Sequence, residues 1–219
     1  MINKDNMTGK EDELNKDEIA GAKKQIRKHV LKTRSSMDER LRREYDDAIF
    51  SKILSLEEYG KTDIILTYAS YNGEADTYRL IRRALADGKR VGCPVSGVRD
   101  GEPLLDFYYI LSPDDLSEGY RGIPEPDVNK CMKVSKDDIA QALIIVPLVG
   151  YDDEGNRLGY GKGFYDRFLA GHEYMLSAGI AYLCQRCDKL PVDEYDVRPD
   201  IIITEILPYE RRIYGRIDI

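Results

Sequence analysis

An uninterrupted apolar run at residues 143–149, Leu-Ile-Ile-Val-Pro-Leu-Val, constrains the fold of this chain more than any other segment. A strand without polar positions is typical of a parallel sheet that is covered on both faces. The run leads through a polar turn into three alternating glycines and then into a helix pattern that ends near Ala170. This succession predicts one strand-to-helix unit of an α/β sheet.

Similar patterns occur along the rest of the chain. Apolar segments typical of strands lie at residues 63–69, 89–94, 104–110, 177–183 and 200–204, and a helix pattern covers residues 77–86. Strands that alternate with helices favour a parallel sheet with helices on both faces. The sequence therefore predicts the α/β class, with an open, largely parallel sheet in a three-layer, Rossmann-like arrangement.

Two further helices are expected before the first strand. The first runs from about Gly21 to Thr33 and carries basic residues at positions 23, 24, 27, 28 and 32. The second begins at a capping box, Ser36-x-x-Glu39, and repeats apolar residues at spacings of three and four up to Leu56.

Two segments of the chain, residues 1–20 and 111–135, show no helix or strand pattern. Residues 1–20 contain six acids and three lysines with few apolar groups, so they are interpreted as a disordered leader to a single α/β domain at 21–219. Residues 111–135 contain Ile-Pro-Glu-Pro at 123–126. Two prolines fix an extended segment, and extended loops on a scaffold often line sites.

The composition excludes several classes of protein. At 42% hydrophobic and 33% charged residues, the chain of 219 residues is typical of globular proteins. A net charge of −7 argues against nonspecific nucleic-acid binding. No apolar run approaches the roughly 18 residues of a membrane span, and the N-terminus lacks the apolar core of a signal peptide. We expect a cytoplasmic monomer or weak dimer without nucleic-acid or membrane partners.

Cys184 and Cys187 form a C-x-x-C pair, which is compatible with redox chemistry or half of a zinc site. Zinc needs further ligands at suitable spacing, and the two histidines, His29 and His172, lie far from any second pair. Cys184 also follows a strand pattern instead of opening a helix. Structural thiols in a reducing cytosol are therefore favoured.

The glycine segment at residues 157–167 carries the clearest chemical signal. Its glycines alternate with charged residues of both signs: Arg157, Gly159, Gly161, Lys162, Gly163, Asp166 and Arg167. It matches neither the Walker loop nor the G-x-G-x-x-G fingerprint. A tight strand-to-helix connection would explain the glycines alone, but the added charges favour a site for a phosphate with its metal ion.

The segment from Asn156 to Asp166, NRLGYGKGFYD, resembles the 5-formyltetrahydrofolate cyclo-ligase (methenyltetrahydrofolate synthetase) family. Four further elements occur in the family's order across about residues 22–206. They are Lys23-x-x-x-Arg27, Glu74-x-Asp76-Thr77, the Ile-Pro-Glu-Pro segment, and Leu190-Pro191 followed by Asp196-x-x-x-Asp200-Ile-Ile-x-Thr204. The resemblance implies a catalytic domain that uses ATP to cyclise 5-formyltetrahydrofolate to 5,10-methenyltetrahydrofolate, with release of ADP and phosphate.

The same resemblance implies roles for individual residues, with Mg²⁺ as cofactor and ATP as co-substrate. ATP binding falls to Lys23, Arg27, Arg157, Leu158, Gly159, Tyr160, Gly161, Lys162, Gly163, Phe164 and Tyr165. The residues implied in catalysis are Lys162, Arg157 and Tyr165. Those implied in substrate binding are Tyr71, Asp76, Tyr160 and Phe164. The implied metal ligands are Asp166 and Asp200. The reaction requires no nucleophilic side chain, because phosphorylation of the formyl oxygen lets N10 attack.

Simpler structural roles remain open for several of these residues. Lys23 and Arg27 would also fit a solvated charged helix face, Asp76 would also fit a helix cap, Tyr71 a turn and Asp200 the start of a strand. Arg167 is expected to form an ion pair.

The segment also departs from the family pattern at two positions. Tyr160 stands where many members carry arginine, and Phe164 where tyrosine is usual. The alternative functions are a non-catalytic nucleotide-binding regulator, or another ATP or sugar-phosphate enzyme on a related α/β sheet.

Overall fold

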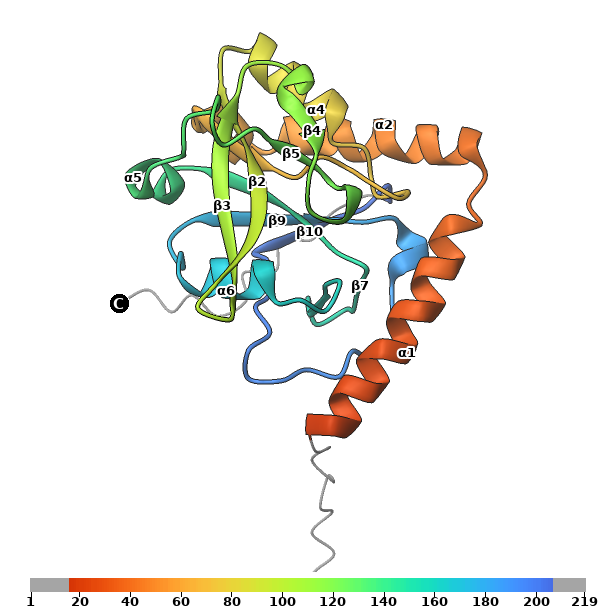
Figure 1. Cartoon of the computed structure of the whole chain (residues 1–219). Helices are drawn as coiled ribbons and strands as arrows, with labels where there is room; N and C mark the ends of the chain where they lie inside the picture. Colours follow the sequence, from red (N-terminus) through yellow and green to blue (C-terminus); the bar gives the residue numbers. More distant parts are fainter. Residues whose placement is uncertain (1–15, 207–219) are drawn as a thin grey trace, which may run out of the picture.

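The computed structural model describes residues 16–206, whose centre is a six-stranded sheet (Figure 1). Its strands in chain order are β1 (Ile64–Thr67), β2 (Arg90–Arg99), β3 (Glu102–Ile110), β6 (Leu143–Pro147), β9 (Leu176–Ile180) and β10 (Ile201–Ile203). They lie side by side in the order β10-β9-β6-β1-β2-β3, and only β3 is antiparallel to its neighbour. The predicted α/β fold with a largely parallel sheet is confirmed.

Helices cover both faces of the sheet. The α-helices among the described residues are α1 (Lys16–Ser35), which lies beside the two covering layers, and α2 (Glu39–Ser55), α3 (Glu57–Lys61), α4 (Tyr78–Ala86), α5 (Lys136–Ala140) and α6 (Phe164–Ala170), which form them. Two short hairpins complete the fold, one of β4 (Leu116–Glu118) with β5 (Pro124–Pro126) and one of β7 (Gly150–Tyr151) with β8 (Arg157–Leu158).

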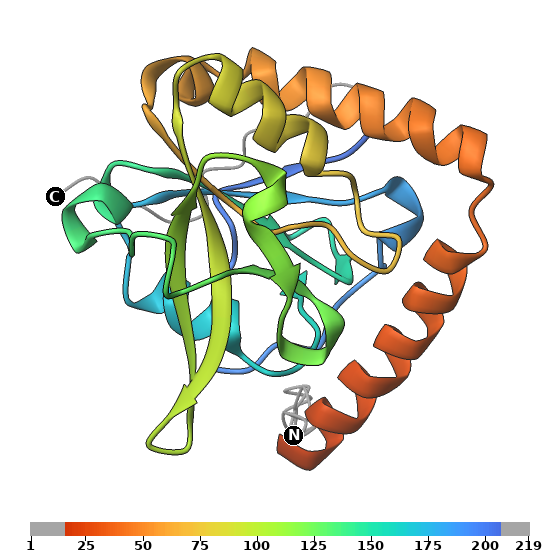
Figure 2. The ribbon, with the colours of Figure 1, turned by 45° about the horizontal axis from the view of Figure 1, so that its top comes forward.

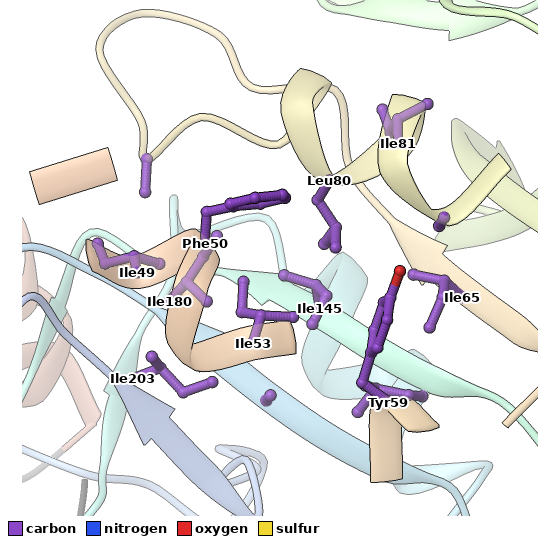
Figure 3. Packing of buried hydrophobic residues seen from close by; sticks show 14 of the residues in the cluster. Ile49, Phe50, Ile53, Tyr59, Ile65, Leu80, Ile81, Ile145, Ile180 and Ile203 are labelled. Atoms are coloured by element: carbon purple, nitrogen blue, oxygen red, sulfur yellow. The ribbon is translucent and has the colours of Figure 1, made fainter. Parts of the chain in front are cut away.

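Successive residues of each central strand are buried in opposite layers, as the alternation of side chains along a strand requires. Ile65 and Ile145 pack under α2, α3 and α4 in the core cluster of Figure 3, beside Ile53. Ile64 and Ile144 pack into the second core with side chains of α5 and α6. Because both faces are buried, residues 143–146 are completely apolar, and the three-layer prediction is confirmed.

Helix α1 lies along one side of the sheet in Figures 1 and 2, apart from the helices of the two covering layers. It begins at Lys16, five residues before the predicted start, and Asp17 and Glu18 in its first turn favour that earlier N-terminus. Residues 16–20 of the predicted leader are therefore helical, and residues 1–15 lie outside the described part of the chain.

The capping box predicted for α2 is wrong by two residues. The Asp38 carboxylate accepts hydrogen bonds from the N–H groups of Arg40 and Leu41, so Asp38 caps the helix instead of Ser36. An aspartate accepts such bonds as well as serine does, so residue type alone does not favour Ser36 over Asp38.

Two observations concern the expectations from composition. Among residues 16–206, no helix is both long and apolar enough to cross a bilayer. The four cysteines are free thiols, and Cys93 is completely buried in the core.

Candidate active site

The candidate site lies where the strand order reverses, between β1 and β6. In open α/β sheets, ligands bind outside the carboxyl ends of the strands at such a switch point. A cavity of about 350 Å³ lies there, between the loop after β1, the end of β6 at Pro147 and the glycine segment. This volume falls within the range of small-molecule sites.

The loop after β1 forms one wall of the cavity through Tyr71, Asn72 and Glu74. Its turn places Asn72 and Gly73 in the left-handed region, at φ of 49° and 73°. The Glu74 carboxylate accepts a hydrogen bond of 2.9 Å from the Tyr71 N–H, which closes the turn. Tyr71 therefore lies at the cavity, where its predicted substrate role requires it to be.

Asp76 lies on the same loop but does not line the cavity. Its carboxylate accepts hydrogen bonds from the N–H groups of Tyr78 and Arg79 at the start of α4. The Asp76 N–H donates to the Asp46 carboxylate. The structure therefore supports the capping role, one of the two roles left open for Asp76.

The glycine segment forms the opposite wall and is held from behind by α1. The Arg27 Nε donates a 2.7 Å hydrogen bond to the carbonyl of Gly159. Gly161 has a φ of 89°, and a β-carbon there would lie 3.0 Å from Cζ of Arg27. Position 161 therefore needs glycine both for its backbone conformation and for the approach of Arg27.

Arg157 and Asp166 form an ion pair at the base of this wall. The Arg157 guanidinium is 2% exposed and also donates to the carbonyl of Pro147 at the end of β6. Asp166 accepts a second hydrogen bond from the N–H of Val197. Both residues line the cavity, so two of the predicted site residues meet there.

Two buried polar atoms of this wall lack a hydrogen-bond partner among the described residues, Nε of Arg157 and the hydroxyl of Tyr165. Burial raises the pKa of Tyr165 well above its ordinary value, so its hydroxyl stays protonated. An unsatisfied buried donor is costly unless a ligand or water pairs with it. The two side chains line the cavity, so these unsatisfied donors lie in its wall.

Lys162 lies exposed at the rim of the cavity. Arg167 points elsewhere and forms the predicted ion pair with Glu102. Among residues 16–206, no carboxylate forms an ion pair with the Lys162 ammonium, so this cation remains available to an anionic ligand.

Lys23 does not reach the cavity. It is 7% exposed, and its ammonium pairs with Asp196 and, at 2.7 Å, with Asp193. These bonds tie α1 to the loop before β10. Lys23 is thus buried, which excludes the solvated face as its environment, and its contact with a nucleotide stays a prediction.

Asp200 lies at the amino end of the strands. Its carboxylate accepts two hydrogen bonds of 2.8 Å from Ser177, at the start of β9. Asp166, in contrast, contacts Arg157 beside the carboxyl end of β6. Two residues lie between Val197, which bonds to Asp166, and Asp200, so the two positions are at most roughly 10 Å apart along the chain. Asp166 and Asp200 therefore bond to different partners near opposite ends of the strands, and their binding of one ion stays a prediction.

The β4–β5 hairpin closes the cavity from the third side with Tyr120, Arg121 and Ile123. The buried Glu125 carboxylate holds it by accepting from the N–H groups of Ser96 and Tyr120. The Ile-Pro-Glu-Pro segment therefore lines the site, as expected from its prolines. Tyr120 and Arg121 were not among the predicted site residues, because no pattern marks the turn that contains them.

Tyr160, one of the two residues that differ from the family pattern, joins the two main walls of the cavity. Its hydroxyl donates a 2.6 Å hydrogen bond to Glu74 and accepts one of 3.0 Å from Arg34 of α1. Burial raises the pKa of Glu74, whereas the bonds from Tyr160 and the Tyr71 N–H and the charge of Arg34 lower it in part. Phe164 packs edge-on against Tyr120, with ring centroids 6.1 Å apart.

The cavity thus combines aromatic walls with cations at one end. Such a surface suits a planar heterocycle joined to, or beside, an anionic group. Its polar groups are placed to bind and orient a ligand, and none of the described cavity residues forms a Ser-His or Cys-His pair. The chemistry that fits is a transfer assisted by positive charge and hydrogen-bond donors.

Comparison with known proteins gives consistent results. Residues 19–205 match the model of the 5-formyltetrahydrofolate cyclo-ligase family. A 5-formyltetrahydrofolate cyclo-ligase from Haemophilus influenzae is 32% identical over 180 residues, which cover 80% of this chain and 93% of the relative. The enzyme of the same name from Escherichia coli K12 is 35% identical over 144 residues, covering 64% of this chain and 76% of the relative.

Solved structures agree with the sequence comparison. The NMR structure of 5,10-methenyltetrahydrofolate synthetase from Aquifex aeolicus superposes with a TM-score of 0.74 at 34% identity, covering 90% of this chain and 95% of that one. A synthetase of the same name from Mycoplasma pneumoniae, at 24% identity and a TM-score of 0.66, supports the fold.

Proposed function

The chain belongs to the 5-formyltetrahydrofolate cyclo-ligase family and is an enzyme of this type, and we propose that it uses ATP to close the folate ring in the cavity at the switch point. The product is 5,10-methenyltetrahydrofolate, with release of ADP and phosphate. The cavity has both features that this reaction requires, aromatic walls for the folate and cations for the phosphates.

The proposed reaction has two steps. The γ-phosphoryl group moves from ATP to the formyl oxygen of the substrate, which leaves ADP and turns a poor leaving group into a good one. N10 then attacks the formyl carbon, the carbon–oxygen bond to phosphate breaks, and N10 loses its proton. Charge builds up on the phosphoryl oxygens during transfer, and fixed donors stabilise it there.

We assign the residues of the glycine wall to the phosphates. Lys162 at the rim is a mobile point charge, and Tyr165 and Arg157 hold unsatisfied donors in the wall itself. Arg27 acts through the backbone by holding the Gly159 carbonyl, so that the N–H groups of the segment face the ligand in one conformation. Lys23 supports this arrangement by fixing the loop at Asp193.

We assign the turn after β1 and the aromatic side chains to the folate. Tyr71, Tyr160 and Phe164 line the cavity from two walls, and Tyr120 faces them from the hairpin. Planar heterocycles stack on such rings. The carboxylate of Glu74 is the polar group on this side and accepts hydrogen bonds from N–H donors.

The residues present fit Mg²⁺ in part. Asp166 lines the cavity beside the proposed phosphate site, and Mg²⁺ is commonly held by one or two carboxylates together with substrate phosphates. Asp200 is engaged with Ser177 at the other end of the strands. We therefore propose Asp166 as the protein ligand, and the bound ion would neutralise phosphate charge.

The observation that carries the proposal is the position of the glycine segment, which holds the family's motif and forms the wall of the cavity. To test it, the protein is incubated with 5-formyltetrahydrofolate and Mg-ATP. The absorbance band of the methenyl product and the release of ADP are then measured. Both signals should appear together in equal amounts. ATP binding without product would instead favour a nucleotide-binding regulator.

The cytosol is the proposed compartment. The supporting observation is that all four cysteines are free thiols, the state that a reducing compartment maintains. Small molecules are the proposed partners, and a monomer or weak dimer is the proposed assembly, to be measured by light scattering.

A further inference from the structure

We propose that Arg34 of α1 is a positioning residue for the folate side of the cavity, where it supplies from behind the wall the guanidinium that position 160 lacks. This inference rests on the proposed function. It follows from the contacts of Arg34, which lies outside the motifs of the family resemblance.

Arg34 is one of the most deeply buried side chains of the protein, at 2% exposure. Its Nη2 donates two hydrogen bonds of 3.0 Å, to the Asn72 carbonyl and to the Tyr160 hydroxyl. Its Nη1 is buried and has no hydrogen-bond partner among the described residues. One side chain thus joins the turn after β1 to the glycine segment.

The hydrogen bonds continue from Arg34 to the cavity surface. The Tyr160 hydroxyl, which accepts from Arg34, donates to Oε1 of Glu74 at 2.6 Å. Oε2 of Glu74 accepts from the N–H of Tyr71 at 2.9 Å. The orientation of the Glu74 carboxylate and of both tyrosines is therefore coupled to Arg34.

A purely structural role does not explain a charged group at this position. The hydrogen bonds that the Arg34 guanidinium donates to the described residues go to a carbonyl and a hydroxyl, and to no carboxylate. Replacement of a buried charge by an apolar side chain of similar volume is often neutral for stability, and an apolar residue would fill the space. The charge acts instead on Glu74, because it lowers the pKa of that carboxyl against the larger effect of burial, which raises it.

The second observation is the nature of residue 160. This chain carries tyrosine there, which has no charge among the cations of the glycine segment. The guanidinium arrives from α1, 126 residues away in sequence, and contacts residue 160 directly. The two positions are therefore coupled by a direct hydrogen bond.

The test compares KM and kcat of Arg34→Met with those of the wild type. We expect KM for 5-formyltetrahydrofolate to rise about tenfold, as for the loss of a charged hydrogen bond, with KM for ATP and kcat within about twofold. Lys32→Met on the exposed face of α1 is the matched control and should change neither. The double variant Arg34→Met with Tyr160→Arg should recover most of the lost affinity, which a structural role would not predict.

Unchanged KM in Arg34→Met, or a double variant no better than the single one, would overturn the proposal. If Arg34→Met does not fold, Tyr160→Phe decides, because it removes only the hydroxyl that links Arg34 to Glu74. It should raise KM for the folate severalfold, and no change would overturn the inference. Calorimetry of 5-formyltetrahydrofolate binding without ATP measures the folate affinity of each variant separately from turnover. A failure of the proposed reaction would instead be seen as an absence of turnover in the wild type.

Discussion

Arg157 and Asp166 form an ion pair that is almost closed to solvent, with the arginine side chain 2% and the aspartate side chain 20% exposed. The pair joins the glycine segment to the first turn of α6, nine residues later. Asp166 is also bound by the N–H of Val197, so the pair connects three segments of the chain at one point. It is therefore both a stabilising contact and a wall of the cavity.

Arg157→Met should destabilise the protein by about 3 kcal/mol, because it leaves the Asp166 carboxylate buried without its counter-charge. Urea unfolding measures this loss. Arg167→Met is the matched control on α6, since it removes only the exposed ion pair with Glu102 and should cost less than about 1 kcal/mol. Equal losses in the two variants would contradict the structural role of Arg157.

Gly161→Ala should impair both stability and turnover. The new side chain requires a φ of 89° and meets the Arg27 guanidinium at 3.0 Å, so we expect a loss of about 1–2 kcal/mol and a displaced glycine segment. Gly21→Ala, at an open position within α1, should instead stabilise by about 0.5–1 kcal/mol. Thermal unfolding and turnover are measured for both variants. Equal effects of the two substitutions would contradict the requirement for glycine at position 161.

Much of the fold could be predicted because it depends on local patterns. Strand β6 at Leu143–Pro147 is apolar at every position, and burial under two helical layers is the reason. The antiparallel direction of β3 could not be predicted, since a strand has the same pattern in either direction. The prediction of the α2 cap was wrong because Ser36 and Asp38 are both of a residue type that caps helices well.

The candidate site could be predicted only where its residues are close in sequence. The glycine segment and the turn after β1 each carry a motif, and both line the cavity. Contacts across long separations leave no local signal, such as the bond from Arg27 to Gly159. Arg34 shows this most clearly, because nothing near it in sequence marks it apart from the other basic residues of α1.

Lys162→Ala should abolish turnover and leave the free energy of unfolding within about 1 kcal/mol of the wild type. Lys162 is exposed at the rim of the cavity, so little packing depends on it, whereas its charge is proposed to act on the transferred phosphoryl group. Lys24→Ala, at an exposed position of α1, is the matched control for charge and should keep full activity. A large loss of stability in Lys162→Ala would show instead that Lys162 has a structural role.

The pH dependence of stability should reveal Glu74. Burial raises its pKa in the folded protein, so its contribution to stability is complete below the ordinary glutamate pKa and is lost as the pH rises through the raised value. The wild type should therefore lose stability relative to Glu74→Gln as the pH rises above the ordinary glutamate pKa of about 4.3. Unfolding of both proteins below and above this pH is the measurement, and a constant difference between them would contradict the raised pKa.

Asp166→Asn and Asp200→Asn should differ in their response to Mg²⁺. Asp166 lines the cavity beside the proposed phosphate site, so its loss should raise the Mg²⁺ concentration needed for half-maximal turnover about tenfold or more. Asp200 is bound to Ser177 at the amino end of β9, so its loss should lower the free energy of unfolding by about 1–3 kcal/mol and leave the Mg²⁺ requirement unchanged.

Ser177→Ala is the control for the second variant, because it removes the hydroxyl that bonds to Asp200 and leaves the carboxylate in place. It should reproduce part of the stability loss of Asp200→Asn without any change in the Mg²⁺ titration. A Mg²⁺ requirement raised equally in Asp166→Asn and Asp200→Asn would contradict the separation of the two carboxylates. That result would mean that both residues reach one ion when ATP is bound, through a movement of the loop that joins Val197 to Asp200.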